Sequence, residues 1–166
     1  MFSTKYKKID HPPLTFNGIH VARKESTKHL GVILDSKLKF KNHILGAIEK
    51  AKNGLSLMKY LSKFVKREVL DLTYKMHVRP YLEYGDVLFH ECSKRMTTLI
   101  ESVQYQAAII ATGCWQCTNR EKLLKEIGWE SLKVRRTFHR LTLYHKIKHK
   151  LAPSYLNPRL RTPNWY

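Results

Sequence analysis

The sequence predicts an α+β chain, mostly helical, in which a short N-terminal β region precedes a bundle of about five helices. Three observations support this prediction. Two short apolar runs near the N-terminus flank an Asn17-Gly18 turn. Apolar residues recur at helical spacing from about residue 42 onwards. Proline or glycine then interrupts this pattern at intervals so short that each helix must pack on its neighbours to be stable.

The region 1–38 is predicted to form strands and turns. Segments 14–16 and 19–21 flank Asn17-Gly18, which supplies the two positive-φ residues of a type I′ hairpin turn. Segment 28–35 is predicted to be a third, largely buried strand. Gly31 inside this strand indicates a bulge or a close approach to the backbone by some other group, whether of a ligand or of the protein.

Two helices are expected in the first half of the bundle. The first covers about 42–63, with an apolar face made of Ile44, Ile48, Ala51, Leu55 and Met58. The second begins near Lys66, with Leu70 beside an apolar set made of Val69, Leu72 and Met76. Pro80 is expected to break or kink this helix before it resumes over 81–89.

Three further helices complete the predicted bundle. The clearest covers 94–112, ends at Gly113, and has an apolar stripe made of Met96, Leu99, Ile100, Val103, Ala107 and Ile110. A short helix follows a capping box from Thr118 to Glu121 and ends at Gly128, with Leu123, Leu124 and Ile127 facing inward. The last covers about 131–150, with an apolar face made of Val134, Phe138, Leu141 and His145.

Charge is the strongest compositional signal. The 166 residues include 31 Lys plus Arg and 13 Asp plus Glu, for a formal net charge of +18. Such an excess repels itself unless a polyanion neutralises it, so nucleic acid is the first candidate partner. An anionic membrane surface is the second candidate, and a merely soluble basic protein remains an alternative.

The positive charge falls in two stretches. Residues 36–67 contain nine Lys or Arg and one acid, and residues 131–150 contain seven Lys or Arg and no acid. The stretch between them is mildly acidic. Two basic faces on a neutral scaffold are therefore expected. Lysines on the exposed side of the 42–63 helix are the best candidates for phosphate contacts, and aromatic side chains among them could stack on bases. For Phe64 and Tyr81 a core position is preferred.

Other features limit the location and the chemistry. The chain has no apolar run near 18–20 residues and no secretory signal at its N-terminus, so we expect an intracellular protein, in nucleus or cytoplasm, with no membrane partner. Three cysteines without such a signal indicate free thiols. Cys114 and Cys117 have zinc-ligand spacing but lack a second cysteine pair. His145 and His149, four apart on a predicted helix, could complete such a site, but two incidental thiols are favoured and no metal site is expected.

The residues alone predict no catalytic site. Glu83 and Asp86 stand three apart, and we expect them to lie on a solvated helix face or to pair with nearby Lys and Arg. No phosphate-binding glycine loop and no Ser-His-Asp arrangement is present.

Several segments together resemble one known family, the reverse transcriptases of LINE-type (non-LTR) retrotransposons. The similarity runs in order through 28–35 (KHLGVILD), 36–44 (SKLKFKNHI), 60–64 (YLSKF), 78–85 (VRPYLEYG), 99–108 (LIESVQYQAA) and 119–132 (NREKLLKEIGWESL). In that family this region is the junction of palm and thumb, where the primer strand is held. The resemblance implies that His29, Leu30 and Gly31 are primer-grip positions, and that Lys63, Lys66 and Arg67 are thumb contacts. With Lys37 and Lys39 they form the predicted nucleic-acid site.

The resemblance also implies what this region lacks. The family's catalytic aspartates lie upstream, with the fingers and most of the palm, and the full-length family uses Mg²⁺. No Asp-Asp pair occurs in the 166 residues. Because polymerisation needs a carboxylate–metal clamp, we expect no catalytic residue and no cofactor here, and no polymerase activity from this chain alone.

The resulting organisation has four parts. Residues 1–38 would be the end of the palm, 39–113 thumb-like helices, 114–153 a downstream helical region and 154–166 an irregular tail. The expected function is that of a polymerase fragment that binds an RNA/DNA primer–template and belongs with the missing palm and fingers. The alternative is a non-catalytic, basic nucleic-acid-binding module derived from such a thumb.

Overall fold

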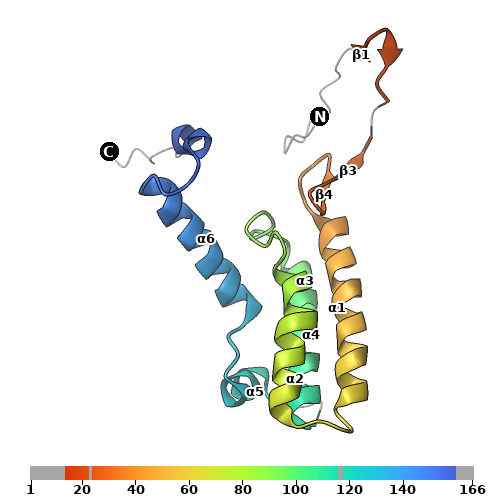
Figure 1. The fold of residues 1–166 in the computed structure, drawn as a ribbon, viewed down its shortest axis with the longest axis vertical. Helices are drawn as coiled ribbons and strands as arrows, with labels where there is room; N and C mark the ends of the chain where they lie inside the picture. The colour runs from red at the N-terminus through yellow and green to blue at the C-terminus, as the bar shows by residue number, and fades with distance from the viewer. Residues whose placement is uncertain (1–13, 23, 116–117, 160–166) are drawn as a thin grey trace.

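The computed structural model describes residues 14–22, 24–115 and 118–159, and it confirms an α+β chain that is mostly helical. Two small β-hairpins lie beyond one end of an elongated helical body, and the last long helix stands to one side of that body (Figure 1). The hydrophobic core lies where the helices of the body face one another.

The first hairpin confirms the predicted turn. Its strands β1 (Thr15–Phe16) and β2 (Ile19–His20) pair antiparallel. Asn17 and Gly18 have φ of 50° and 76°, as a type I′ turn requires. Every described side chain of the two strands is exposed.

The predicted third strand is wrong, because segment 28–35 contains a turn. It is split between β3 (Ser26–His29) and β4 (Val32–Asp35), which form a second antiparallel hairpin. Leu30 and Gly31 have φ of 45° and 82°, so the chain reverses there and Gly31 is a turn residue rather than a bulge. The prediction of a buried strand is also wrong, since β3 is exposed throughout and only Val32 of β4 is buried.

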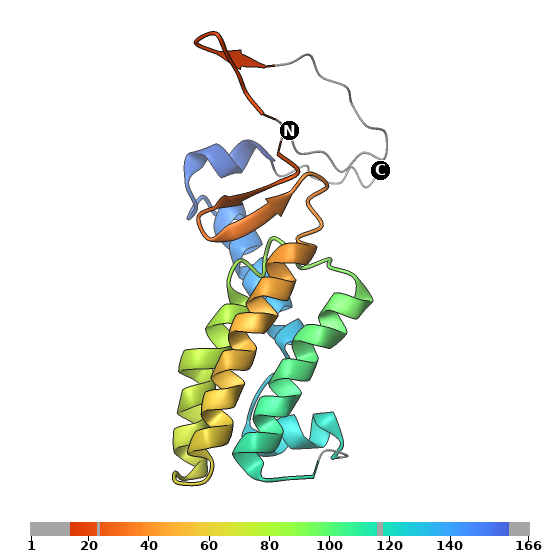
Figure 2. The same cartoon turned by 90° about the vertical axis from the view of Figure 1, so that its right-hand side faces the viewer.

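The helix α1 (Lys41–Leu61) confirms the first predicted helix, and all five residues of its predicted apolar face are buried. It lies side by side with α4 (Lys94–Thr112) (Figure 2). On another side α1 approaches a π-helical turn closely. A Cβ atom on Gly54 would lie 2.6 Å from the His77 carbonyl oxygen, so only glycine fits at this crossing.

The second helix is continuous through three segments, α2 (Arg67–Thr73), the π-helix η1 (Tyr74–Val78) and α3 (Arg79–Glu83). Pro80 does not break it, because the wider π turn just before the proline shifts the hydrogen-bond register where its N–H is missing. The predicted helix over 81–89 ends early, at Glu83. Gly85 has φ of 72°, and turns follow to residue 91.

The predicted apolar face of this helix is wrong. Val69, Leu72 and Met76 are exposed, whereas Leu70, Tyr74 and Val78 are buried. The reason is a tertiary contact, since the Tyr74 ring stacks on Trp129 with centroids 3.8 Å apart. This stacking turns a different face of the helix inward.

The remaining helices differ from expectation in detail. α4 and its Gly113 cap match the prediction. In α5 (Arg120–Ile127) the N-cap is Asn119, which accepts from Lys122 N at 3.2 Å, because the Thr118 hydroxyl is bonded to the Trp115 carbonyl. Gly128 ends this helix with φ of 75° as predicted.

The last helix, α6 (Leu132–Lys148), has nearly the predicted bounds, but the face predicted to point inward points to solvent. Val134, Phe138, Leu141 and His145 are exposed, while Leu132 and Arg136 are buried. The tail contains a short 3-10 helix, η2 (Ser154–Arg159), and residues 160–166 of the predicted tail lie outside the described residues.

Candidate nucleic-acid interface

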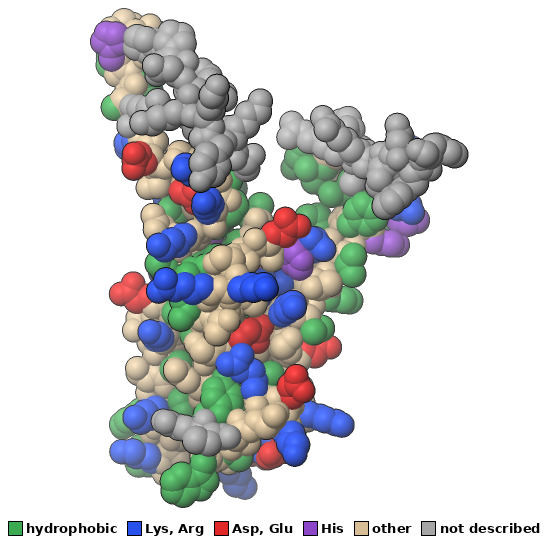
Figure 3. Space-filling view, turned by 180° about the vertical axis from the view of Figure 1, so that it is seen from behind, with side chains coloured by type: hydrophobic (Ala, Val, Ile, Leu, Met, Phe, Trp, Pro, Cys, Tyr) green, Lys and Arg blue, Asp and Glu red, His purple; other side chains and the backbone are tan. Residues whose placement is uncertain are grey.

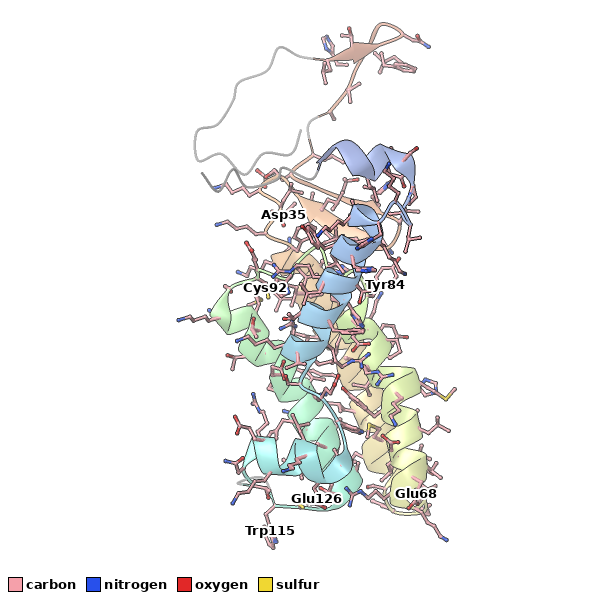
Figure 4. All side chains as sticks on the ribbon, turned by 90° about the vertical axis from the view of Figure 1, so that its left-hand side faces the viewer. Asp35, Glu68, Tyr84, Cys92, Trp115 and Glu126 are labelled. Atoms are coloured by element: carbon pink, nitrogen blue, oxygen red, sulfur yellow. The ribbon has the colours of Figure 1, made fainter. Side chains whose placement is uncertain are left out.

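The predicted nucleic-acid site is divided between the two ends of the helical body. Asp35, Tyr84 and Cys92 mark the hairpin end, and Glu68 and Glu126 mark the far end (Figure 4). The ends are separated by α1, whose 21 residues at about 1.5 Å each span about 30 Å. Lys37 and Lys39 therefore lie far from Lys63, Lys66 and Arg67. Only an extended ligand could contact both groups.

The turn of the second hairpin carries the three predicted primer-grip residues. The Tyr84 hydroxyl donates to the Leu30 carbonyl oxygen at 2.5 Å. A Cβ atom on Gly31 would lie 3.1 Å from Tyr84 Oη, so the close approach expected at this glycine is made by a side chain of the same protein. The side chains of His29 and Leu30 remain exposed and available to a ligand.

The loop between β4 and α1 is held in shape by Asp35. Its carboxylate accepts hydrogen bonds from the backbone N–H groups of Lys37 and Lys39, each at 3.1 Å, and of Phe40 at 2.6 Å. Leu38 and Phe40 have φ of 53° and 55°, which such a tight loop requires. The side chains of Lys37 and Lys39 are exposed, while the Phe40 ring is buried beneath them.

A hollow of about 760 Å³ lies between this loop and the segment that leads into α4. Four cations and one acid line it, namely Lys37, Lys39, Lys41, Arg95 and Glu91, and its apolar lining includes Phe40, Phe89 and Met96. The N-termini of α1 and α4 both reach this hollow. Helix N-termini favour anions through their free N–H groups, so they add to the field of the cations.

A stripe of lysines continues from the hollow along α1. Lys41, Lys52 and Lys59 lie within about 20° of one another around the helix, at about 100° per residue. Within the described residues, no ion pair engages these ammonium groups or that of Lys50. Figure 3 shows Lys and Arg side chains following the α1 side of the molecule.

The predicted residues at the far end differ in their surroundings. Lys63 and Lys66 are exposed in the connection between α1 and α2. The Arg67 guanidinium is engaged within the protein, since it donates to the Glu126 carboxylate and to the Glu126 carbonyl oxygen, both at 3.1 Å. Lys63 and Lys66 are thus the stronger candidates for phosphate contacts.

Two aromatic residues depart from the expected core positions. Phe64 and Tyr81 are 70% and 44% exposed, so the preference for burial is wrong for both. The Phe64 ring contacts exposed Tyr60, with centroids 5.4 Å apart. This exposed ring pair lies beside Lys63, where it could stack on a base while the lysine holds a phosphate.

The arginines of the second basic stretch are paired or buried within the protein, whereas Lys133, Lys146 and Lys148 are exposed and have no ion pair among the described residues. Arg135 donates to the Glu83 carboxylate, and this hydrogen bond raises the pKa of the guanidinium. His139 Nδ1 lies 2.6 Å from Asp86 Oδ2, and Arg140 pairs with Glu91 at 3.7 Å. The expectation of pairing with Lys or Arg is confirmed for Glu83, which faces Arg79 and Arg135. It is wrong for Asp86, which is buried and has a histidine as its partner.

The sequence did not indicate Arg95 as part of the hollow. Arg95 is separated from the loop at 37–41 by more than fifty residues, and only the packing of α4 on α1 brings them together. No local pattern records such a contact. Lys41, by contrast, adjoins the predicted Lys37 and Lys39.

The expectations about metal binding and membrane spans can be compared with the described residues. Within them, no group of three His, Cys, Asp or Glu side chains is arranged to hold a metal ion, and Cys117 lies outside them. None of the described helices combines the length and apolar character that a membrane span needs.

Comparison with known proteins provides no family assignment. No protein-family model, curated protein or solved structure matches the chain. The functional interpretation therefore depends on the sequence and on the geometry described above.

Proposed function

We propose that this chain binds an RNA/DNA primer–template along its phosphate backbone, as the thumb-like part of a non-LTR retrotransposon RNA-directed DNA polymerase. The observation that carries the proposal is the set of cations along α1 that have no carboxylate partner in the part of the chain that the structure describes. Lys41, Lys52 and Lys59 share one side of the helix and lead into the hollow that Arg95 also lines. An ammonium group without a carboxylate partner is available to neutralise a phosphate.

The proposed contact is with the backbone rather than with base edges. Lysines along a helix side contact phosphates at many sequences equally, so affinity should depend strongly on salt and little on sequence. The length of α1, about 30 Å, matches roughly nine base pairs of duplex at about 3.4 Å each. A duplex could therefore extend from the hollow to Lys63 and Lys66.

No catalytic step is assigned to this chain. The described residues do not offer a carboxylate cluster that fits the Mg²⁺ of the family. Under the proposal this chain contributes binding, and the carboxylates belong to the part of the polymerase upstream of the resembling region.

The binding proposal can be tested by fluorescence anisotropy with an RNA–DNA duplex. We expect K39Q/K41Q to lower affinity about tenfold and to reduce the slope of log K against log salt by about 2. The control K122Q/K125Q removes two exposed cations from α5 and should change affinity less than twofold. Equal losses in the two variants would contradict the proposed interface.

The alternative, a basic module without a polymerase role, differs in whether it should prefer one kind of duplex end. A primer grip should hold a recessed 3′ end more tightly than a blunt duplex, whereas a basic module should bind both equally. L30A tests the grip, because Leu30 is 80% exposed and its loss should leave the fold intact. If the full chain shows no preference for a recessed end, the polymerase part of the proposal fails and the basic module remains.

A further inference from the structure

The helix α6 turns its apolar side to solvent. Val134, Phe138 and Leu141 are 55%, 66% and 55% exposed. Figures 1 and 4 show α6 as an outer layer on the side of the molecule away from α1, so no described element covers this face. An outward apolar face is unusual on a helix whose inward side, besides the apolar Leu132, buries Arg136, and it requires a cause.

The cause is the set of polar contacts beneath the helix. Arg135 and His139 pair with Glu83 and Asp86, which lie at the end of α3 and in the turn after it. The Glu101 carboxylate also accepts from Lys133 N at 2.7 Å, near the start of α6. These partners fix the rotation of the helix, so the apolar stripe can face only outward.

The stripe has the spacing of a helix–helix seam. Positions 134, 138, 141 and 145 step by four, three and four residues, the alternation of the a and d positions of a heptad. They lie within about 60° around the helix, at about 100° per residue. Thr137 and Thr142 flank the stripe on its two sides.

This narrow stripe fits another helix better than a membrane surface. A helix that lies on a membrane has a wide apolar face, with cations beside it that reach the lipid headgroups. Here the side chains of Arg135, His139 and Arg140 are turned toward carboxylates of the same chain. A second helix packing at the seam needs only the narrow stripe.

The charge around the stripe determines the kind of helix that would bind. On α6 the exposed cations without an ion pair among the described residues are Lys133, Lys146 and Lys148, and no acid lies on this helix. A second copy of the same helix would bring like charges together, which the net charge of +18 makes worse. A helix with acidic residues beside its apolar positions complements both the stripe and its surroundings.

We propose that the outer face of α6 is a docking surface for an acidic amphipathic helix of a partner protein, whose apolar residues pack on Val134, Phe138 and Leu141. The proposal is independent of nucleic-acid binding, because the helix α1 lies on the opposite side of the helical body from α6 (Figure 1).

The test uses the full chain and two synthetic peptides of about three heptads with Glu at e and g. One peptide has Leu at a and d, and the other has Ser there with the same charge. We expect the Leu peptide to bind at least tenfold more tightly, as measured by calorimetry. F138S/L141S should reduce its affinity to that of the Ser peptide.

The control V69S/L72S removes exposed apolar side chains from α2 and should leave peptide affinity unchanged. Circular dichroism checks that both variants fold, and duplex affinity should stay unchanged in F138S/L141S. Equal binding of the two peptides would overturn the proposal, because charge alone would explain it. A dimer in sedimentation, or binding to phosphatidylserine vesicles, that F138S/L141S abolishes would overturn it in favour of a second copy or of lipid.

Discussion

Two helices of this protein, α1 and α6, are both basic and amphipathic, yet they are used in opposite ways. α1 buries an apolar face and leaves Lys41, Lys50, Lys52 and Lys59 without ion pairs in the described structure. α6 buries Arg136, pairs Arg135, His139 and Arg140 with carboxylates, and exposes its apolar stripe. The comparison teaches that contacts within the fold, rather than composition alone, decide which cations of a basic stretch remain available. Among the described residues these four lysines of α1 have no ion pair, whereas the Lys and Arg of α6 left exposed without one are Lys133, Lys146 and Lys148.

The largest expected effect concerns the apolar faces of these two helices. Ile44 of α1 is 1% exposed, so I44A should lower the free energy of unfolding by about 3 kcal/mol through lost burial and a cavity. F138A of α6 removes a larger side chain but should change it by less than about 0.5 kcal/mol. Urea unfolding measures both, and a loss above about 2 kcal/mol for F138A would mean that α6 faces inward.

The helices α1 and α6 also show what the periodicity of apolar residues in a sequence can determine. For α1 the spacing of Ile44, Ile48, Ala51, Leu55 and Met58 predicted both the helix and its buried face. For α6 the same kind of spacing predicted the helix correctly and its buried face wrongly. Periodicity identifies an apolar side but not its direction, and in α6 the direction depends on Glu83 and Asp86, which are distant in sequence.

The second effect concerns the ion pairs that orient α6. Glu83 faces both Arg135 and Arg79 and is mostly shielded from solvent, so E83Q should lower the free energy of unfolding by about 2 kcal/mol. The matched control E49Q on α1 removes an exposed acid and should change it by less than about 0.5 kcal/mol. Amide hydrogen exchange should quicken first in α6 of E83Q, and unaltered exchange there would argue against ion-pair orientation.

The third effect compares the two sets of lysines as ligands for nucleic acid. The variant K41Q/K52Q/K59Q should lower the affinity for an RNA–DNA duplex about tenfold, because each lysine neutralises a phosphate. K133Q/K146Q/K148Q removes the same charge from α6 and should lower it less than threefold. A larger loss in the second variant would place the interface on α6.

The smallest effect is a pH dependence at the loop beneath α6. Burial, followed by the positive charges of Arg140 and Arg136, lowers the pKa of His90 below its ordinary 6.5, while Glu91 and Asp86 act in the opposite direction. The unfolded chain therefore binds the proton more readily, so His90 contributes no loss of stability above about pH 6.5 and an increasing loss below it. Urea unfolding at each pH should show that H90N loses less stability than the native chain between about pH 7 and pH 5. An equal loss in the two proteins would contradict this role of His90.

Parts of the candidate site could be predicted from the sequence and parts could not. Lys37 and Lys39 were predicted from their place in the chain, and the structure adds Lys41 beside them. Arg95 required the packing of α4 on α1, and Tyr84 required the docking of the hairpin turn at Leu30 and Gly31. Local patterns such as Asn17-Gly18 and Gly113 succeeded because neighbouring residues alone determine those turns and caps.

The most direct test of the proposed function is lysine footprinting by acetylation and mass spectrometry, with and without an RNA–DNA duplex. An interface along α1 predicts protection of Lys39, Lys41, Lys52 and Lys59 when the duplex is bound, with Lys122, Lys133 and Lys146 reacting as in the free protein. Protection confined to the α6 lysines, or equal protection of every exposed lysine, would contradict an interface on α1.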